Sequence, residues 1–233
     1  MAGHLTRKEL KSDQVAVTLE HTVDYVQAHQ QPIVRAAIAV VALAVVIGGF
    51  VFYRSQQKVV RDTRLAEAQQ VSAAPVGAVG TPDAMAFPTN DAKATEETKV
   101  FTKLAADYPG TEQGYIAEYY LGGVLVSQAK LEEARKKYQD VSDHASKDIA
   151  SLAKFAVAQI DFQENRTADA QKILQDLIDH PTALVSHDQA AYTLADGIRK
   201  TNPADARKLL EPMVKESGPV AGDATRILSE LPK

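Results

Sequence analysis

The sequence contains no cysteine and no tryptophan, and aromatic residues make up only 6% of its 233 positions. The absence of cysteine excludes disulfides, thiolate nucleophiles, thiolate zinc sites and redox motifs, and it fits an oxidising or a reducing compartment equally. There is also no excess of positive charge, since the formal net charge is -4. Without a global positive field, we expect no nucleic-acid partner.

The motifs of phosphate binding, nucleophilic catalysis and metal-dependent hydrolysis are missing as well. The chain has no G-x-x-x-x-G-K-[ST] loop, no G-x-G-x-x-G turn and no G-x-S-x-G elbow. Its histidines are scattered, and no two stand four residues apart beside an acidic residue as in H-E-x-x-H. We therefore predict that the protein is not an enzyme and has no catalytic residues, no metal site and no cofactor.

One long apolar run is present near the N-terminus. It spans Ala36 to Phe52 without a polar residue, and residues 33–53 extend it with only Arg35 interrupting. A helix of this length covers about 31 Å, which matches a hydrocarbon core of about 30 Å. We therefore predict a single transmembrane helix at 33–53, inserted in a lipid bilayer. A cleaved signal peptide or a buried core helix would also be apolar, but a signal peptide has a shorter apolar region and a brief basic leader.

The region ahead of this run, residues 1–32, contains apolar residues at helical spacing within SDQVAVTLEHTVDYVQ. This spacing predicts a short amphipathic helix that lies either on the lipid surface or on a partner. After the run, the helical pattern continues to Gln70. It is then interrupted at 71–90 by prolines and glycines, which predict a long loop.

From Asp91 onward, helical stretches alternate with short breaks, and three of these stretches align at a shift of thirty-six residues. An alanine recurs at the same place in each, at Ala134, Ala170 and Ala206. Large residues follow it one and two turns later, which is the pattern of a helix face that packs closely at one turn and fills a core at the next. The aligned segments are LEEARKKYQDV, TADAQKILQDL and PADARKLLEPM.

These segments resemble the second helix of the tetratricopeptide repeat, which carries a small residue followed four positions later by a large one. Counting back to the first helix gives Leu121 and Gly122, the Leu-Gly pair that the family uses for close helix approach, and then Val157 and Ala158. The third repeat departs from the pattern, because Leu194 stands where a small residue is expected.

Together with the apolar run, this resemblance implies an all-α fold: an N-terminal single transmembrane helix followed by a divergent tetratricopeptide-like solenoid over residues 54–233. The first helix pair would join residues 54–70 to the segment that holds Phe101 and Leu104. A terminal helix at 219–231 would cap the array. The sequence makes no prediction of the oligomeric state.

First helices of such a stack line a concave surface that binds peptides or partner helices. The aromatic residues at these positions could equally belong to the core, because helical spacing does not separate core from groove. In the repeat register, the candidate protein-binding groove consists of Tyr119, Phe155, Gln159, Phe162, Gln163 and Arg199.

The whole layout is similar to that of the ancillary Sec-translocon subunit family. This resemblance implies a scaffold for protein–protein interaction that is anchored in the bacterial inner membrane, with its repeats in the periplasm and with the Sec translocon and chaperones as partners. The basic residues Arg54, Lys58, Arg61 and Arg64 follow the apolar run closely and favour the opposite orientation. A cytoplasm-facing adaptor or accessory subunit therefore stays open as an alternative. A repeat-containing enzyme is a second alternative, for which no catalytic constellation is visible.

Overall fold

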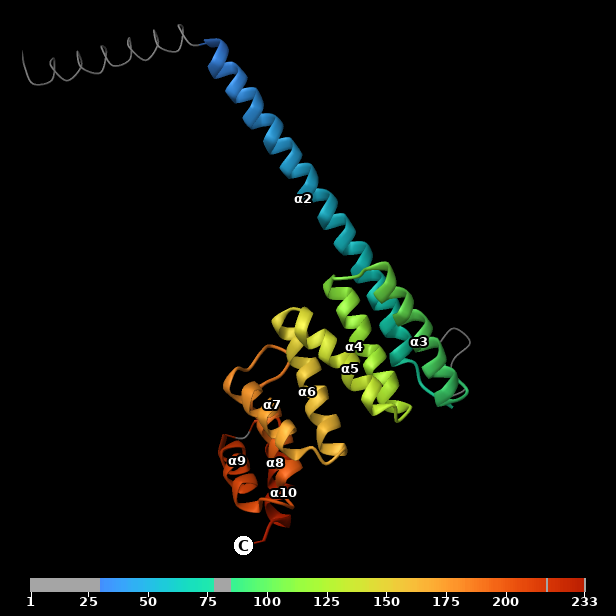
Figure 1. The fold of residues 1–233 in the computed structure, drawn as a ribbon, viewed down its shortest axis with the longest axis vertical. Helices are drawn as coiled ribbons and strands as arrows, with labels where there is room; N and C mark the ends of the chain where they lie inside the picture. Colours follow the sequence, from blue (N-terminus) through green and yellow to red (C-terminus); the bar gives the residue numbers. More distant parts are fainter. Residues whose placement is uncertain (1–29, 78–84, 217, 233) are drawn as a thin grey trace, which may run out of the picture. The chain divides into compact units, whose positions relative to one another are not determined.

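The computed structural model describes residues 30–77, 85–216 and 218–232, and within these ranges its regular structure is helical (Figure 1). The described part of the chain contains one isolated bridge between extended residues, Val76 and Phe87. The predicted all-α class is therefore confirmed. The chain divides into two compact units, Met1–Val59 and Val60–Lys233. The amphipathic helix predicted from SDQVAVTLEHTVDYVQ, within residues 1–32, falls outside the described residues.

The apolar run lies in α2 (Gln30–Ala73), which begins in the first unit and ends in the second. Among the described helices, α2 is the one whose length and composition would allow it to cross a membrane. Its most apolar part is not buried, and the side chains of Val46 and Phe52 are 67% and 66% exposed. Apolar side chains exposed over such a length are typical of a helix that contacts lipid or another protein.

The second unit continues with eight described helices that follow one another in chain order (Figure 1). Each packs against the described helices that precede and follow it in the chain, and α10, the last of them, packs against α9. These elements are α3 (Asn90–Asp107), α4 (Glu112–Ser127), α5 (Leu131–His144), α6 (Lys147–Gln163), α7 (Thr167–Asp179), α8 (His187–Ile198), α9 (Pro203–Glu216) and α10 (Ala221–Glu230).

The first helix pair joins the end of α2 to α3. Leu65 and Ala68 of α2 pack against Phe101 and Leu104 of α3 in one apolar cluster. Between the two helices, the Lys93 ammonium donates to the backbone carbonyl oxygens of Ser72 at 2.5 Å and Ala74 at 2.9 Å. These carbonyls lie in the last turn of α2 and just after it, where unpaired acceptors and the helix dipole favour a cation.

Local sequence signals explain where several helices begin. The hydroxyl groups of Thr89, Thr111 and Ser186 accept hydrogen bonds from backbone N–H groups in the first turns of α3, α4 and α8. Such N-cap bonds satisfy donors that a helix start leaves free.

The predicted close contacts of the second helices are confirmed. Ala134, Ala170 and Ala206 are each 0% exposed, on α5, α7 and α9. Gly122 of α4 lies against the ring of Tyr138 on α5, and a Cβ atom added to this glycine would lie 2.6 Å from Cε1 of that ring. The Leu-Gly position therefore allows the close approach that the repeat requires.

Two of the turns inside helix pairs repeat the same backbone conformation thirty-six residues apart. Ala129 and Asn165 have φ values of 58° and 60°, in the left-handed region. The residue after each donates its N–H to a carbonyl five residues back, from Lys130 to Leu125 and from Arg166 to Asp161. This is the Schellman bond that closes a helix C-terminus.

The α8–α9 pair makes its close contact at another position. Leu194 is buried in the core, and the glycine of α8 stands three residues later. A Cβ atom on Gly197 would lie 2.3 Å from Cζ of Phe162, so the ring of α6 occupies the space that the glycine leaves. Leu194 therefore replaces the expected small residue because the close contact of α8 is made by Gly197, and it is made with the neighbouring repeat.

Candidate protein-binding surface

The first helices of successive pairs lie against one another. Helix α6 contacts both α4 and α8, whereas contacts between the described second helices α5, α7 and α9 are slight or lacking. First helices that lie closer together than second helices give a repeat array an inner surface lined by first helices.

Four of the six candidate groove residues lie on α6, and they divide into buried and exposed pairs. Phe155 is 8% exposed and belongs to the core, and Phe162 is partly buried against Gly197. Gln159 and Gln163 are exposed. The aromatic side chains of α6 therefore pack the array, and its amides face the solvent.

The other two candidates lie on neighbouring helices. Arg199 directly follows α8 and pairs with the carboxylates of Asp196 at 3.2 Å and Glu230 at 2.8 Å, so that it joins α8 to α10. Tyr119 of α4 is partly buried, with its ring centroid 5.2 Å from that of Tyr138.

Tyr119 lines a cavity of about 660 Å³, hereafter the tyrosine cavity, which falls within the usual size of a ligand pocket. The ends of α2 and α4, the start of α3 and one residue of α5 surround it. Tyr120 and Tyr138 line it as well. The ring of Tyr120 stacks on Phe101 at 4.5 Å and meets Tyr119 edge to face at 6.2 Å.

Asp91 and Glu97 of α3 also line the tyrosine cavity, and neither carboxylate has an ion pair with another described residue. Lys93 lines it too, but its ammonium is bonded to the carbonyls at the end of α2. These residues and Tyr138 lie on helices that are far apart along the chain, so no sequence pattern predicts that they line one cavity.

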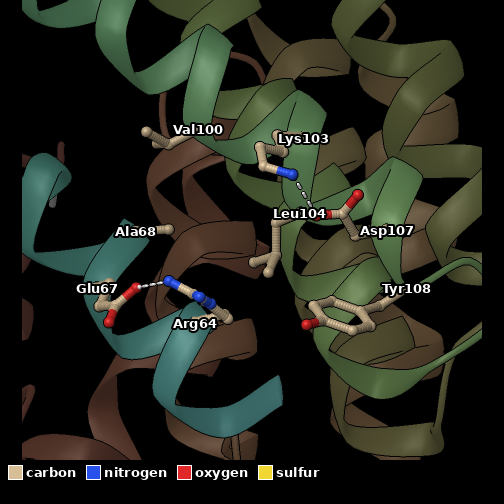
Figure 2. Close-up of a pocket in the computed structure, with 8 residues that line it drawn as sticks. All are labelled: Arg64, Glu67, Ala68, Val100, Lys103, Leu104, Asp107 and Tyr108. Carbon is tan, nitrogen blue, oxygen red and sulfur yellow. Dashed lines mark hydrogen bonds and ion pairs between the residues drawn. The ribbon is translucent and has the colours of Figure 1, made fainter. Parts of the chain in front are cut away.

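A second cavity, of about 370 Å³, lies between the last turns of α2 and the helix α3 (Figure 2). Ala68 and Leu104 contribute apolar side chains to it. Its charged residues pair along their own helices, Arg64 with Glu67 at 2.9 Å and Lys103 with Asp107 at 2.7 Å (Figure 2). These pairs leave the cavity without an excess of either charge.

A network of charged side chains joins the second helix pair to the third. The guanidinium of Arg135 on α5 bonds to Glu164 and lies 2.7 Å from the carboxylate of Asp161 on α6. Arg166, in the following turn, reaches the same two carboxylates. Burial raises the pKa of Asp161, and the positive charge of Arg135 opposes this shift. Because the network contacts both pairs, its geometry fixes their mutual position.

Within the described ranges, no three His, Asp or Glu side chains converge as a metal site would require. A family model for the tetratricopeptide repeat-like domain matches residues 29–191, from the start of α2 into α8. No curated protein and no solved structure has significant similarity to the chain.

Proposed function

Because the chain belongs to the family of tetratricopeptide repeat-like domains, we propose that it is a membrane-anchored scaffold that binds other proteins. One observation supports the binding role most directly. The first helices lie against one another, and some of their polar side chains are exposed and take no part in the packing of the array. Gln159 and Gln163 are exposed on α6, and the tyrosine cavity opens beside α4. Surfaces of this kind bind extended peptides or single helices.

The membrane anchor in this proposal is the apolar part of α2, residues 33–53. Its described side chains are exposed, as Val46 and Phe52 illustrate, and an apolar helix in water would carry a large hydrophobic cost. The family match begins at residue 29 and so includes this segment together with the repeats. Both observations support the proposal that this segment anchors the repeat domain in the membrane.

For partners and location, we propose the bacterial inner membrane, with the repeats in the periplasm and with the Sec translocon and periplasmic chaperones as binding partners. Support for this comes from the order of segments along the chain. The basic residues that favour a cytoplasmic domain also have roles within the repeat unit, where Arg61 donates to Gln113 and Arg64 pairs with Glu67. The cytoplasm-facing adaptor remains the second candidate, because the charge bias itself favours it.

Three measurements on full-length protein in native vesicles test this proposal. We expect the chain to resist extraction with carbonate, since only disruption of the bilayer releases a spanning helix. External protease should digest the repeats in vesicles whose periplasmic face is outward and spare them in inverted vesicles. Cross-linking followed by purification should recover translocon subunits or chaperones. Release by carbonate contradicts the anchor, the reverse protease pattern favours the adaptor, and the absence of any cross-linked protein contradicts the scaffold.

A further inference from the structure

We propose that the tyrosine cavity binds a cationic side chain, an arginine or lysine of an extended partner peptide. This inference rests on the proposed scaffold function and names the chemistry of the partner. The cavity combines aromatic rings, carboxylates without ion pairs and a hydroxyl group without a hydrogen-bond partner among the described residues. Each of these favours a cation.

The hydroxyl group belongs to Tyr138, a residue of α5 that is 4% exposed as a whole and lines the cavity. Its ring is held against Gly122, and its Oη atom would lie 3.7 Å from a Cβ atom on Gly123, an exposed glycine that also lines the cavity. Among the described residues, no hydrogen-bond partner contacts this Oη atom. This oxygen is therefore free to accept a hydrogen bond from an N–H donor that enters the cavity.

The charges around the cavity are predominantly negative. Asp91 and Glu97 contribute two carboxylates, and the C-termini of α2 and α4 contribute the negative ends of two helix dipoles. The one cation, Lys93, is bonded to carbonyl oxygens at the end of α2 and so offsets one of these dipoles. The N-terminus of α3 is the remaining positive element, and Asp91 in its first turn opposes it. An anionic ligand would meet repulsion here.

Aromatic rings give the cation a second mode of attraction. Tyr119 and Tyr120 line the cavity edge to face, with centroids 6.2 Å apart, and Tyr138 tilts against Tyr119. A guanidinium or ammonium group is attracted to the faces of such rings. Arginine suits the site best, since its planar group can stack on a ring while its N–H groups reach a carboxylate and the Tyr138 hydroxyl.

The test measures peptide binding to full-length protein in detergent micelles. The probes are heptapeptides Gly-Ser-Ala-X-Ala-Ser-Gly that carry the same fluorescein label and differ only in the central residue X, which is arginine, lysine, glutamine or glutamate. Fluorescence anisotropy should show that the arginine peptide binds about tenfold or more tightly than the glutamine peptide, with the glutamate peptide weakest. The preference should weaken at raised ionic strength.

Three variants locate the binding, with a matched control. Gly123→Leu should fill the cavity mouth and reduce affinity about tenfold or more, while a leucine at this exposed helix position should not lower the melting temperature. Tyr138→Phe keeps the ring on Gly122 and should weaken arginine binding several-fold. Glu97→Gln should do the same, whereas Glu96→Gln should not, because Glu96 pairs with Lys99 and does not line the cavity.

The inference is overturned if the four peptides bind alike, if none binds, or if Gly123→Leu binds the arginine peptide as the parent does. Cross-linking of the parent and of Gly123→Leu in vesicles separates these failures from failure of the scaffold. If both proteins capture the same partners equally, the scaffold function is supported and the cation site is contradicted. If neither protein captures a partner, the scaffold function itself is contradicted.

Discussion

Gly122 lies directly against the ring of Tyr138, and the neighbouring Gly123 does not. A Cβ atom would be 2.6 Å from Cε1 of Tyr138 at the first position, but 3.7 Å from its hydroxyl oxygen at the second. The ring is 4% exposed and cannot move aside easily. Two adjacent glycines in one helix therefore serve different purposes.

This difference predicts opposite effects of one substitution. Gly122→Ala should destabilise the protein by about 1 to 3 kcal/mol, because the added methyl group overpacks the contact between α4 and α5. Gly123→Ala should be neutral or stabilise it by up to about 1 kcal/mol, because alanine is the better helix former. Chemical denaturation followed by circular dichroism measures both, and an equal loss in the two variants would contradict the assigned contact.

Phe155 and Gln159 lie one turn apart on α6 and should respond differently to truncation. Phe155 is 8% exposed within the core, so Phe155→Ala should lower the free energy of unfolding by about 3 to 5 kcal/mol. Gln159 is exposed, so Gln159→Ala should change it by less than about 0.5 kcal/mol. If Gln159→Ala weakens partner capture at unchanged stability, α6 takes part in the binding surface. A stable Phe155→Ala variant would instead move this ring out of the core.

Arg135 should be critical for stability although it is charged. Arg135→Ala leaves the carboxylate of Asp161, whose side chain is 4% exposed, with only Arg166 as its cationic partner. Removing one partner of a buried ion pair costs about 3 to 5 kcal/mol, and the remaining arginine places the expected loss toward the lower end. The adjacent exposed residue gives the control: Lys136→Ala should stay within about 0.5 kcal/mol of the parent. Urea denaturation distinguishes the two, and similar midpoints would contradict the role of the network.

Glu118 should make stability depend on pH. Burial raises the pKa of its carboxyl group above the ordinary value of 4.5, and the positive charge of Lys137 opposes the shift. Between these two pKa values the folded protein binds a proton that the unfolded chain releases, so stability falls as pH rises through that window. Glu118→Gln should therefore be more stable than the parent at neutral pH, and the difference should shrink as pH falls to about 4.5. Melting temperatures across this range measure the effect. Glu211→Gln, at an exposed position on α9, controls for the loss of one negative charge.

Much of the fold was predictable because its strongest constraint is a repeated one. The same buried position is occupied in three helices by Ala134, Ala170 and Ala206. Because these alanines recur at a shift of thirty-six residues, the repeat can be recognised from the sequence alone. The contact between Gly197 and Phe162 was not predictable, since it joins two repeats and has no counterpart at the same shift.

The candidate site was less accessible to prediction for two physical reasons. A first helix is covered on more than one side, so helical spacing alone could not decide that Phe155 is buried while Gln159 is exposed. The tyrosine cavity also takes Asp91 from the start of one helix and Tyr138 from the middle of another. Their proximity depends on how the pairs stack, and a single sequence carries no local signal of that geometry.

The packing of each helix against its chain neighbours also determines how this protein unfolds. No strand pairs distant segments across the described repeats, so few contacts require a long loop to close, and such arrays fold rapidly from local nuclei. Among the described helices, α10 packs mainly on α9 and is joined to α8 through the pair Arg199–Glu230, so it should open early and expose Ile227 before the cluster around Phe101 is disturbed. Hydrogen exchange should therefore record graded protection along the chain, and a protease that trims the C-terminal helices would shorten the array from that end while the α2–α3 pair stays folded.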